Sequence, residues 1–303
     1  MKVTLLGTGG TIPTLRRNLP AIALQRDGDI FLFDCGEGTQ VQFLKASLSP
    51  GKLFAICLTH LHGDHVTGLP GLLMTIMQQS RERSLFIFGP PGIREFITLF
   101  KKSLGFNPSY FLDVREISEG RFYSGPNFFM EAVAVDHKPR TLAYCLQEAP
   151  RPGRFHPEKA KELGVPEGPL FGRLQRGETL TLESEKVITP SMVMGSPRKG
   201  RKFVYVTDTR PCPQVVAFAD DADLLIHEGM FISEMENEAH LKGHSTVGQA
   251  AQIAKDARVR KFVITHISSR YRRTDELRKE AHNIFPGAIV GKDLMEILIP
   301  LHK

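Results

Sequence analysis

The chain has 303 residues, of which 41% are hydrophobic and 24% charged, and its formal net charge at pH 7 is +6. This composition is typical of a soluble globular protein, and no apolar run approaches the ~20 residues that a membrane-spanning helix needs. The four cysteines are scattered without a C-x-x-C pair, so we expect reduced, mostly buried thiols and a cytoplasmic location rather than a disulfide-bonded secreted protein.

The beginning of the chain predicts three strands. Met1–Gly7 is interrupted by glycine too soon to be a signal peptide, and Lys2–Gly7 predicts the first strand. Further strands are expected at Ala21–Gln25 and Ile30–Phe33. The last of these ends at Asp34, which is a candidate either to orient a metal-bound imidazole or to act as an ordinary turn aspartate.

A dense group of imidazoles follows the next apolar run, Leu53–Leu58, which predicts a buried strand. Three histidines and one aspartate then follow Thr59 within six residues, namely His60, His62, Asp64 and His65. His60 and His62 can face one point in space, and Asp64 and His65 can face a second. Imidazole and carboxylate ligands on a rigid strand end suit Zn²⁺, and also Mn²⁺ or Fe²⁺, and a site without thiolates is more often catalytic than structural.

The next elements alternate between helices and strands. We expect helices at 68–79, 92–104, 247–256 and 274–283, and short strands at 85–88, 224–226 and up to residue 299. Ser245 or Thr246 is the expected cap of the third of these helices.

Three further strands end in residues of the same ligand types, namely Phe128–Val135 before His137, Phe203–Val206 before Asp208, and Phe262–Ile264 before His266. A single carboxylate, such as that of Asp208, can bridge two metals. His266 repeats the strand-then-Thr-His pattern seen at His60. Each of these strand ends alone indicates little, but four of them in one chain predict a metal site.

Residues 150–202 differ in composition from the rest of the chain. They contain seven prolines and many glycines, and their eleven Lys and Arg residues against six Asp and Glu residues give a net charge of +5, nearly all of the chain's +6. We expect an insertion on the scaffold rather than a core layer. The composition is compatible with a solvated loop region or with a basic arm that binds phosphates.

The H-x-H-x-D-H motif of residues 60–65 resembles the signature of the metallo-β-lactamase superfamily. The resemblance implies an α/β fold, a four-layer αββα sandwich with two metals at one edge. It assigns His60, His62 and His137 to one metal and Asp64, His65 and His266 to the other, with Asp208 bridging them. We therefore expect two Zn²⁺ per subunit, or Mn²⁺ or Fe²⁺ in their place. Two such cations, roughly 3.5–4 Å apart, would hold a hydroxide that attacks phosphorus or a carbonyl.

Shorter motifs narrow the resemblance to the ribonuclease Z family in its short bacterial form: Gly7–Gly10, Pro13–Asn18, Asp34–Gln40, Thr207–Arg210, His244–Thr246 and Thr265–Tyr271. This resemblance covers essentially the whole chain. It implies cleavage of precursor tRNA just past the discriminator nucleotide, which leaves a tRNA 3′-hydroxyl and a 5′-phosphorylated trailer. It also implies a homodimer and, within a single domain of residues 1–303, a flexible arm at 150–202 that holds tRNA by shape and phosphate.

The same resemblance implies roles for single side chains. Asp64 would be both a ligand and the base acting on the attacking water. His244 would protonate the departing 3′-oxygen, the alternative being a neighbour of the helix cap without chemistry. Arg17, Asn18 and Arg270 would bind RNA phosphates, although both arginines could equally be solvated surface charges.

The sequence departs from the family pattern at two places. Leu15 stands where the family usually has lysine, and Gly229-Met230 follow His227-Glu228 where the family has Ala-Thr. These differences concern contacts to the RNA end and leave the metal ligands intact. The alternative functions are a small-molecule phosphodiesterase or arylsulfatase of the same superfamily, a non-catalytic RNA-binding protein on this fold, and a hydrolase of thioesters or β-lactams.

Overall fold

The structure is a computed structural model that describes residues 1–79 and 81–302. The chain forms two compact units. The larger contains Met1–Gln147 and Lys202–Pro300, and the smaller contains Glu148–Arg201 with the C-terminal residues from Leu301. We call them the sandwich unit and the insertion unit. The insertion expected at 150–202 lies almost wholly within the smaller one, and residues 80 and 303 of the expected single domain lie outside the described residues.

The first sheet of the sandwich unit has seven strands, in the order β18 (Glu296–Leu298), β1 (Lys2–Gly7), β3 (Ala21–Arg26), β4 (Asp29–Phe33), β5 (Leu53–Cys57), β6 (Leu85–Gly89) and β7 (Leu112–Glu116). Strands β18, β1, β3 and β4 pair antiparallel, and β4 to β7 pair parallel. The parallel strands therefore end at one common edge.

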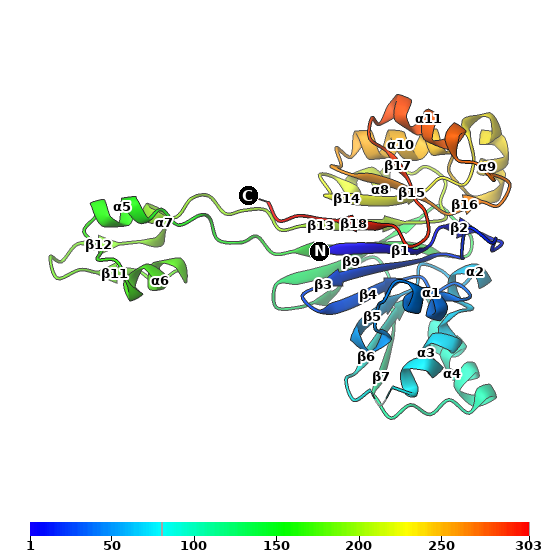
Figure 1. The fold of residues 1–303 in the computed structure, drawn as a ribbon, viewed down its shortest axis with the longest axis horizontal. Coiled ribbons are helices and arrows are strands. Elements are labelled where there is room, and N and C mark those ends of the chain that lie inside the picture. The colour runs from blue at the N-terminus through cyan, green and yellow to red at the C-terminus, as the bar shows by residue number, and fades with distance from the viewer. Residues whose placement is uncertain (80, 303) are drawn as a thin grey trace. The chain divides into compact units, whose positions relative to one another are not determined.

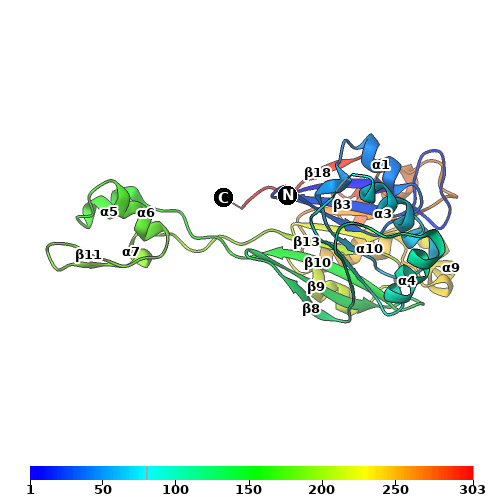
Figure 2. The ribbon, with the colours of Figure 1, turned by 90° about the horizontal axis from the view of Figure 1, so that it is seen from below.

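The second sheet also has seven strands, in the order β17 (Ile289–Val290), β15 (Phe262–Thr265), β14 (Leu224–Glu228), β13 (Lys202–Val206), β10 (Thr141–Glu148), β9 (Phe128–Val135) and β8 (Gly120–Ser124). Strands β13, β14, β15 and β17 are parallel. Their near-continuous apolar runs are typical of strands that are covered on both faces. Figure 2 shows β8, β9, β10 and β13 side by side in this sheet.

Helices cover the outer face of each sheet (Figure 1). The first sheet carries α1 (Thr39–Lys45), α3 (Leu69–Met77) and α4 (Ile93–Leu104), and the second carries α8 (Pro213–Ala219), α10 (Val247–Asp256) and α11 (Asp275–Ile284). The remaining short elements are β2 (Gly9–Gly10), β16 (Ile267–Ser268), α2 (Gly63–Val66), α9 (Glu236–Lys242), and the 3₁₀ turns Pro50–Lys52 and Ser233–Met235.

Side-chain alternation along the strands explains these layers. In β3, Ala21 and Ala23 pack under the helices of the first sheet, whereas Ile22 and Leu24 fill the space between the two sheets. Successive side chains of a strand face opposite sides, so one strand supplies two cores at once. The order helix, sheet, sheet, helix is the predicted four-layer αββα sandwich. The sequence did not lead us to expect β7, β8, β10 or α8.

The insertion unit has a small core of its own. It contains α5 (Pro157–Glu162), α6 (Pro169–Gln175), the hairpin of β11 (Leu180–Thr181) and β12 (Val187–Ile188), and α7 (Pro190–Val193). The buried residues of this core are Ala160, Val165, Leu174, Leu180, Ile188 and Val193. The unit is therefore more than a solvated loop. Across the described part of the chain, no helix combines the length and hydropathy needed to cross a bilayer.

Candidate metal centre

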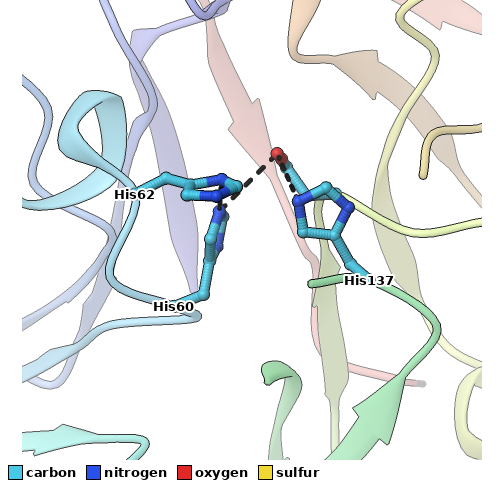
Figure 3. Close-up of side chains that lie close together, drawn as sticks. His60, His62 and His137 are labelled. Atoms are coloured by element: carbon cyan, nitrogen blue, oxygen red, sulfur yellow. Dashed lines mark hydrogen bonds and ion pairs between the residues drawn. The ribbon is translucent and has the colours of Figure 1, made fainter. Parts of the chain in front are cut away.

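The predicted ligands meet where the parallel strands of both sheets end. His60 and His62 lie in the loop after β5, His137 follows β9, Asp208 follows β13 and His266 follows β15. Figure 3 shows the imidazoles of His60, His62 and His137 converging on one point. Residues far apart in the sequence are thus brought together by strand ends, which hold them rigidly.

Two groups of side chains can each surround a cation. The nearest ligand atoms of His60, His62, His137 and Asp208 all lie within 4.8 Å of one another, and the same holds for those of Asp64, His65 and His266. These are the two groups that the sequence predicts. A third group, with the same spacing, adds His244 to Asp208 and His266.

Asp208 divides its two carboxylate oxygens between these groups. Its Oδ2 lies 3.7 Å from Nε2 of both His60 and His137, and its Oδ1 lies 3.4 Å from His65 Nε2 and 3.1 Å from His266 Nε2. Asp64 Oδ2 lies 3.5 Å from Nε2 of both His65 and His266. Asp208 therefore has the geometry of a ligand shared between two cations.

Several of the buried nitrogens need a partner that the protein does not provide. Nε2 of His65, His137 and His266 is buried without a hydrogen-bond partner among the described residues. An unsatisfied buried polar atom costs about 1–3 kcal/mol, so such atoms call for an explanation. Nitrogen and oxygen atoms that converge in this way fit a divalent cation of the zinc, manganese or iron type.

Neighbouring groups orient the imidazoles toward this point. Asp34 Oδ2 lies 2.8 Å from His65 Nδ1, and the Asp34 carboxylate also accepts hydrogen bonds from the Thr59 backbone and from the Tyr205 hydroxyl. His137 Nδ1 lies 2.8 Å from the backbone carbonyl of Gly243. Such partners fix the ring and leave Nε2 for the metal. Of the two interpretations of Asp34 that the sequence left open, this geometry favours the orienting one.

Electrostatics favours the ligand forms of several of these groups. Burial lowers the pKa of His60 to about 2, with further lowering by His65, and burial also lowers the pKa of His137. Burial alone would raise the pKa of Asp208, but His266 and His65 hold it well below its usual value. Burial would lower the pKa of His65, yet Asp208 and Asp34 raise it well above its usual value. The same negative charge that retains a proton there would attract a cation.

His244 is held by a buried carboxylate that we did not predict. Its Nδ1 lies 3.0 Å from Oε1 of Glu228, the fully buried last residue of β14, which also accepts from the Thr209 backbone N–H at 2.7 Å. Burial would lower the pKa of His244, but attraction to Glu228 outweighs it and raises the pKa to about 9. The sequence signal that could have identified Glu228 is its position as an acidic residue at the end of the apolar run that forms β14.

The loop between Gly10 and Asn18 touches the centre from one side. A Cβ on Gly10 would lie 2.6 Å from the ring of His266, so only glycine fits there. The Thr11 N–H donates to Asp64 Oδ2 at 2.8 Å. Asp293 holds both ends of the loop, because it accepts from the backbone N–H groups of Thr8 at 3.0 Å and Asn18 at 2.6 Å.

The backbone at three site residues is left-handed. The φ angles are +57° at Asp34, +20° at Asp208 and +54° at His266. Side-chain-bearing residues rarely adopt such angles, which cluster at functional sites where the surrounding structure enforces them.

The predicted phosphate contacts lie at different places. One cavity of about 830 Å³, which we call the metal-centre cavity, is lined by four of the candidate ligands, namely His62, Asp64, His137 and Asp208. Arg270 also lines it, and its Nη2 lies 2.8 Å from Glu238 Oε1. Arg17 does not line that cavity, and its Nη1 donates to Thr8 Oγ1 and to the Gly291 carbonyl. Asn18 donates through Nδ2 to the Glu37 carbonyl and also lies outside the cavity.

Known proteins resemble this chain over its whole length. Residues 173–267 match the family model of a beta-lactamase superfamily domain, and residues 1–147 match that of the anti-Pycsar protein Apyc1. A ribonuclease Z of Methanosarcina acetivorans is 46% identical, over 99% of this chain and 98% of that protein. A ribonuclease Z of Halalkalibacterium halodurans is 41% identical over 100% of both. The crystal structure of human tRNase Z, short form, has a TM-score of 0.73 at 28% identity and covers 99% of this chain and 100% of that one.

Proposed function

Because the chain belongs to the ribonuclease Z family, we propose that it is the endoribonuclease that removes the 3′ trailer from precursor tRNA. The products would be a tRNA with a 3′-hydroxyl and a trailer with a 5′-phosphate. The observation that carries this proposal is identity of 41–46% along essentially the full chain to proteins of that name, together with an intact and mostly buried set of His and Asp side chains that could hold metal ions.

The proposed cofactor is a pair of Zn²⁺ ions, one held by His60, His62 and His137 and the other by Asp64, His65 and His266, with Asp208 shared between them. Two bound cations of this kind supply a water that ionises near neutral pH and positive charge beside the phosphate. The donor set supports zinc and is also compatible with manganese or iron.

The protein's own groups would move the protons. The carboxylate of Asp64, which lines the metal-centre cavity, is the proposed acceptor of the proton from the attacking water. The P–O3′ bond then breaks, and the departing 3′-oxygen needs a proton. We assign the donation to Nε2 of His244, since Nδ1 of that ring faces Glu228 at 3.0 Å and the ring lines the same cavity.

The remaining contacts to the substrate are also proposals. The insertion unit would hold tRNA through phosphates, supported by exposed bases such as Lys159, Arg173 and Lys186 and by the net charge of the stretch. Arg270, at the metal-centre cavity, would bind a phosphate near the cut. Arg17 and Asn18 would act on the RNA end through the loop that they hold. We also propose a homodimer that acts in the cytoplasm.

The test is a cleavage assay on a 3′-extended tRNA with purified protein, before and after chelator treatment. We expect one cut past the discriminator nucleotide, loss of cutting after chelation, and recovery with Zn²⁺ or Mn²⁺. Primer extension and 3′-end labelling would identify the two new ends. If the metal-loaded protein hydrolyses only a small phosphodiester and leaves the tRNA uncut, the small-molecule phosphodiesterase is the better assignment. Binding of tRNA without any cleavage would instead support the non-catalytic alternative.

A further inference from the structure

A second cavity, also of about 830 Å³, adjoins the metal-centre cavity. Ile12, Ser268 and Ser269 line both cavities, so the two cavities are neighbours that share these three residues. One side of the second cavity is the loop that begins at Gly10, and the other is the segment that follows β16. We call it the basic cavity.

Positive charge dominates the lining of the basic cavity. Five bases line it, namely Arg16, Arg17, Arg272, Arg273 and Lys292, against two acids, Asp275 and Asp293. Arg16 Nη1 donates to the Arg272 carbonyl at 3.2 Å, a neutral partner at an exposed position. Two further bases are held by part-buried neutral groups or by a carboxylate. Arg17 Nη1 donates to Thr8 Oγ1 at 2.6 Å and to the Gly291 carbonyl at 2.7 Å, and Arg273 Nε lies 3.0 Å from Asp275 Oδ2.

The other three bases carry unneutralised charge. Arg16, Arg272 and Lys292 are exposed, and within residues 1–79 and 81–302 no carboxylate lies at ion-pair distance from them. Asp293 does not form an ion pair with any of the three, and its carboxylate oxygens accept hydrogen bonds from Thr8 and Asn18. Nothing in the metal centre requires these three cations, so they are available to an anionic ligand.

Resting on the function proposed above, we propose that the basic cavity binds the phosphodiester backbone of the trailer, the unpaired RNA strand on the 3′ side of the cut. A cavity of about 830 Å³ has the size of a small-ligand site and accommodates a few unpaired nucleotides, not a helix. The acceptor side of the cut is a helix apart from the discriminator nucleotide, whereas the trailer is a single strand. Point charges bind phosphate without reading bases, so trailers of different sequence would be accepted.

The test compares precursor tRNAs whose trailers contain one nucleotide or several nucleotides. In the double variant Arg272→Ala/Lys292→Ala, we expect KM for the long trailer to rise about tenfold with kcat nearly unchanged. The one-nucleotide trailer should be cleaved as by the parent protein, because it does not reach the cavity. For the long trailer, the slope of log KM against log salt should fall by about 0.7 for each contact removed.

The matched control is Arg94→Ala/Lys279→Ala, which removes the same two side-chain types from exposed positions on α4 and α11 outside the basic cavity. It should behave as the parent on both substrates. Equal losses on the two trailers, or no loss on either, would overturn the proposal. If the parent cleaves neither substrate, the proposed function fails instead. Anisotropy of a labelled single-stranded oligoribonucleotide then tests the cavity directly, and equal affinity for the parent and the double variant would refute it.

Discussion

The sandwich unit and the insertion unit place their charged groups in opposite ways. In the sandwich unit most of the candidate metal ligands are buried, with Asp208 and His266 only 3% and 1% exposed, although His62 is exposed and Asp64 half-buried. In the insertion unit the core cluster is apolar, none of the described Lys or Arg residues is buried, and the buried Glu148 is paired with Arg201. Bond breaking needs atoms fixed to within fractions of an ångström, whereas holding a large polyanion needs only charge at the surface. The comparison therefore predicts that chemistry and substrate affinity can be lost separately.

The largest effect should come from Asp64→Ala, which removes a proposed metal ligand and the proposed proton acceptor together. We expect the cleavage rate of precursor tRNA to fall by about 10³-fold or more, while tRNA affinity stays nearly unchanged. Single-turnover kinetics and filter binding measure the two quantities. Asp256→Ala, an exposed carboxylate on α10, is the control. Unchanged turnover would rule out the role given to Asp64.

Removing the insertion unit should lower tRNA affinity and leave the bond-breaking chemistry intact, the reverse of the result expected for Asp64→Ala. Its ends lie together, since Glu148 N donates to the Arg201 carbonyl at 2.9 Å, so a short Gly-Ser linker can replace residues 149–200. We expect kcat/KM for precursor tRNA to fall roughly 10³-fold, and hydrolysis of bis(p-nitrophenyl) phosphate to remain. Metal content and a thermal melt would confirm folding. Full activity on both substrates would contradict RNA binding by this unit.

The His244→Ala variant would separate proton donation from the other chemical steps assigned to the sandwich unit. Loss of a general acid should lower the rate of tRNA cleavage by about 10²-fold. Hydrolysis of a p-nitrophenyl phosphodiester should change little, because p-nitrophenolate leaves without a proton. Glu228→Gln should act in the same direction more weakly, and His240→Ala, at an exposed position on α9, serves as control. Equal losses on both substrates would make His244 a ligand rather than an acid.

A smaller effect is expected from Asp293→Asn. The variant weakens the hold on Thr8 and Asn18, and hence on the loop whose Thr11 N–H orients Asp64. We expect kcat to fall about tenfold and zinc to exchange about tenfold faster from one of the two sites, as measured by chelator competition. Asp275→Asn, in the same basic cavity but away from the loop, should leave both quantities unaltered.

The grouping of the candidate ligands at strand ends was predictable because their sequence pattern is local. An apolar run of strand length followed at once by His or Asp marks β5, β13 and β15, and the carboxyl ends of parallel strands share an edge. The helix cap at Thr246 was also among the expected positions, and its side chain accepts from Gln249 N. Sequence patterns of this kind carry over to the structure because each depends on neighbouring residues only.

Contacts between distant segments were not predictable. The role of Glu228 depends on its contact with His244, and that of Asp293 depends on its hydrogen bonds from Thr8 and Asn18. No sequence periodicity relates these positions, so neither role could be inferred from the sequence. Arg17 resembled an exposed base in the sequence, yet its Nη1 donates to a carbonyl 274 residues away. The core of the insertion unit was missed as well, because single apolar residues between prolines and glycines give no helical or strand period.

Selection for heat resistance alone would act against the metal centre at His266. This residue holds a left-handed backbone angle, which glycine adopts without the steric cost of about 1–2 kcal/mol that a side chain adds, and both of its ring nitrogens are buried without a hydrogen-bond partner among the described residues. A mutant library screened only for survival of heating would therefore tolerate glycine there, and those clones would lack a proposed metal ligand. Asp34 shares the left-handed angle but is protected from this replacement, because its carboxylate accepts hydrogen bonds from Thr59 and Tyr205. Durability and turnover compete at His266, so any engineered variant of this chain has to be screened for both.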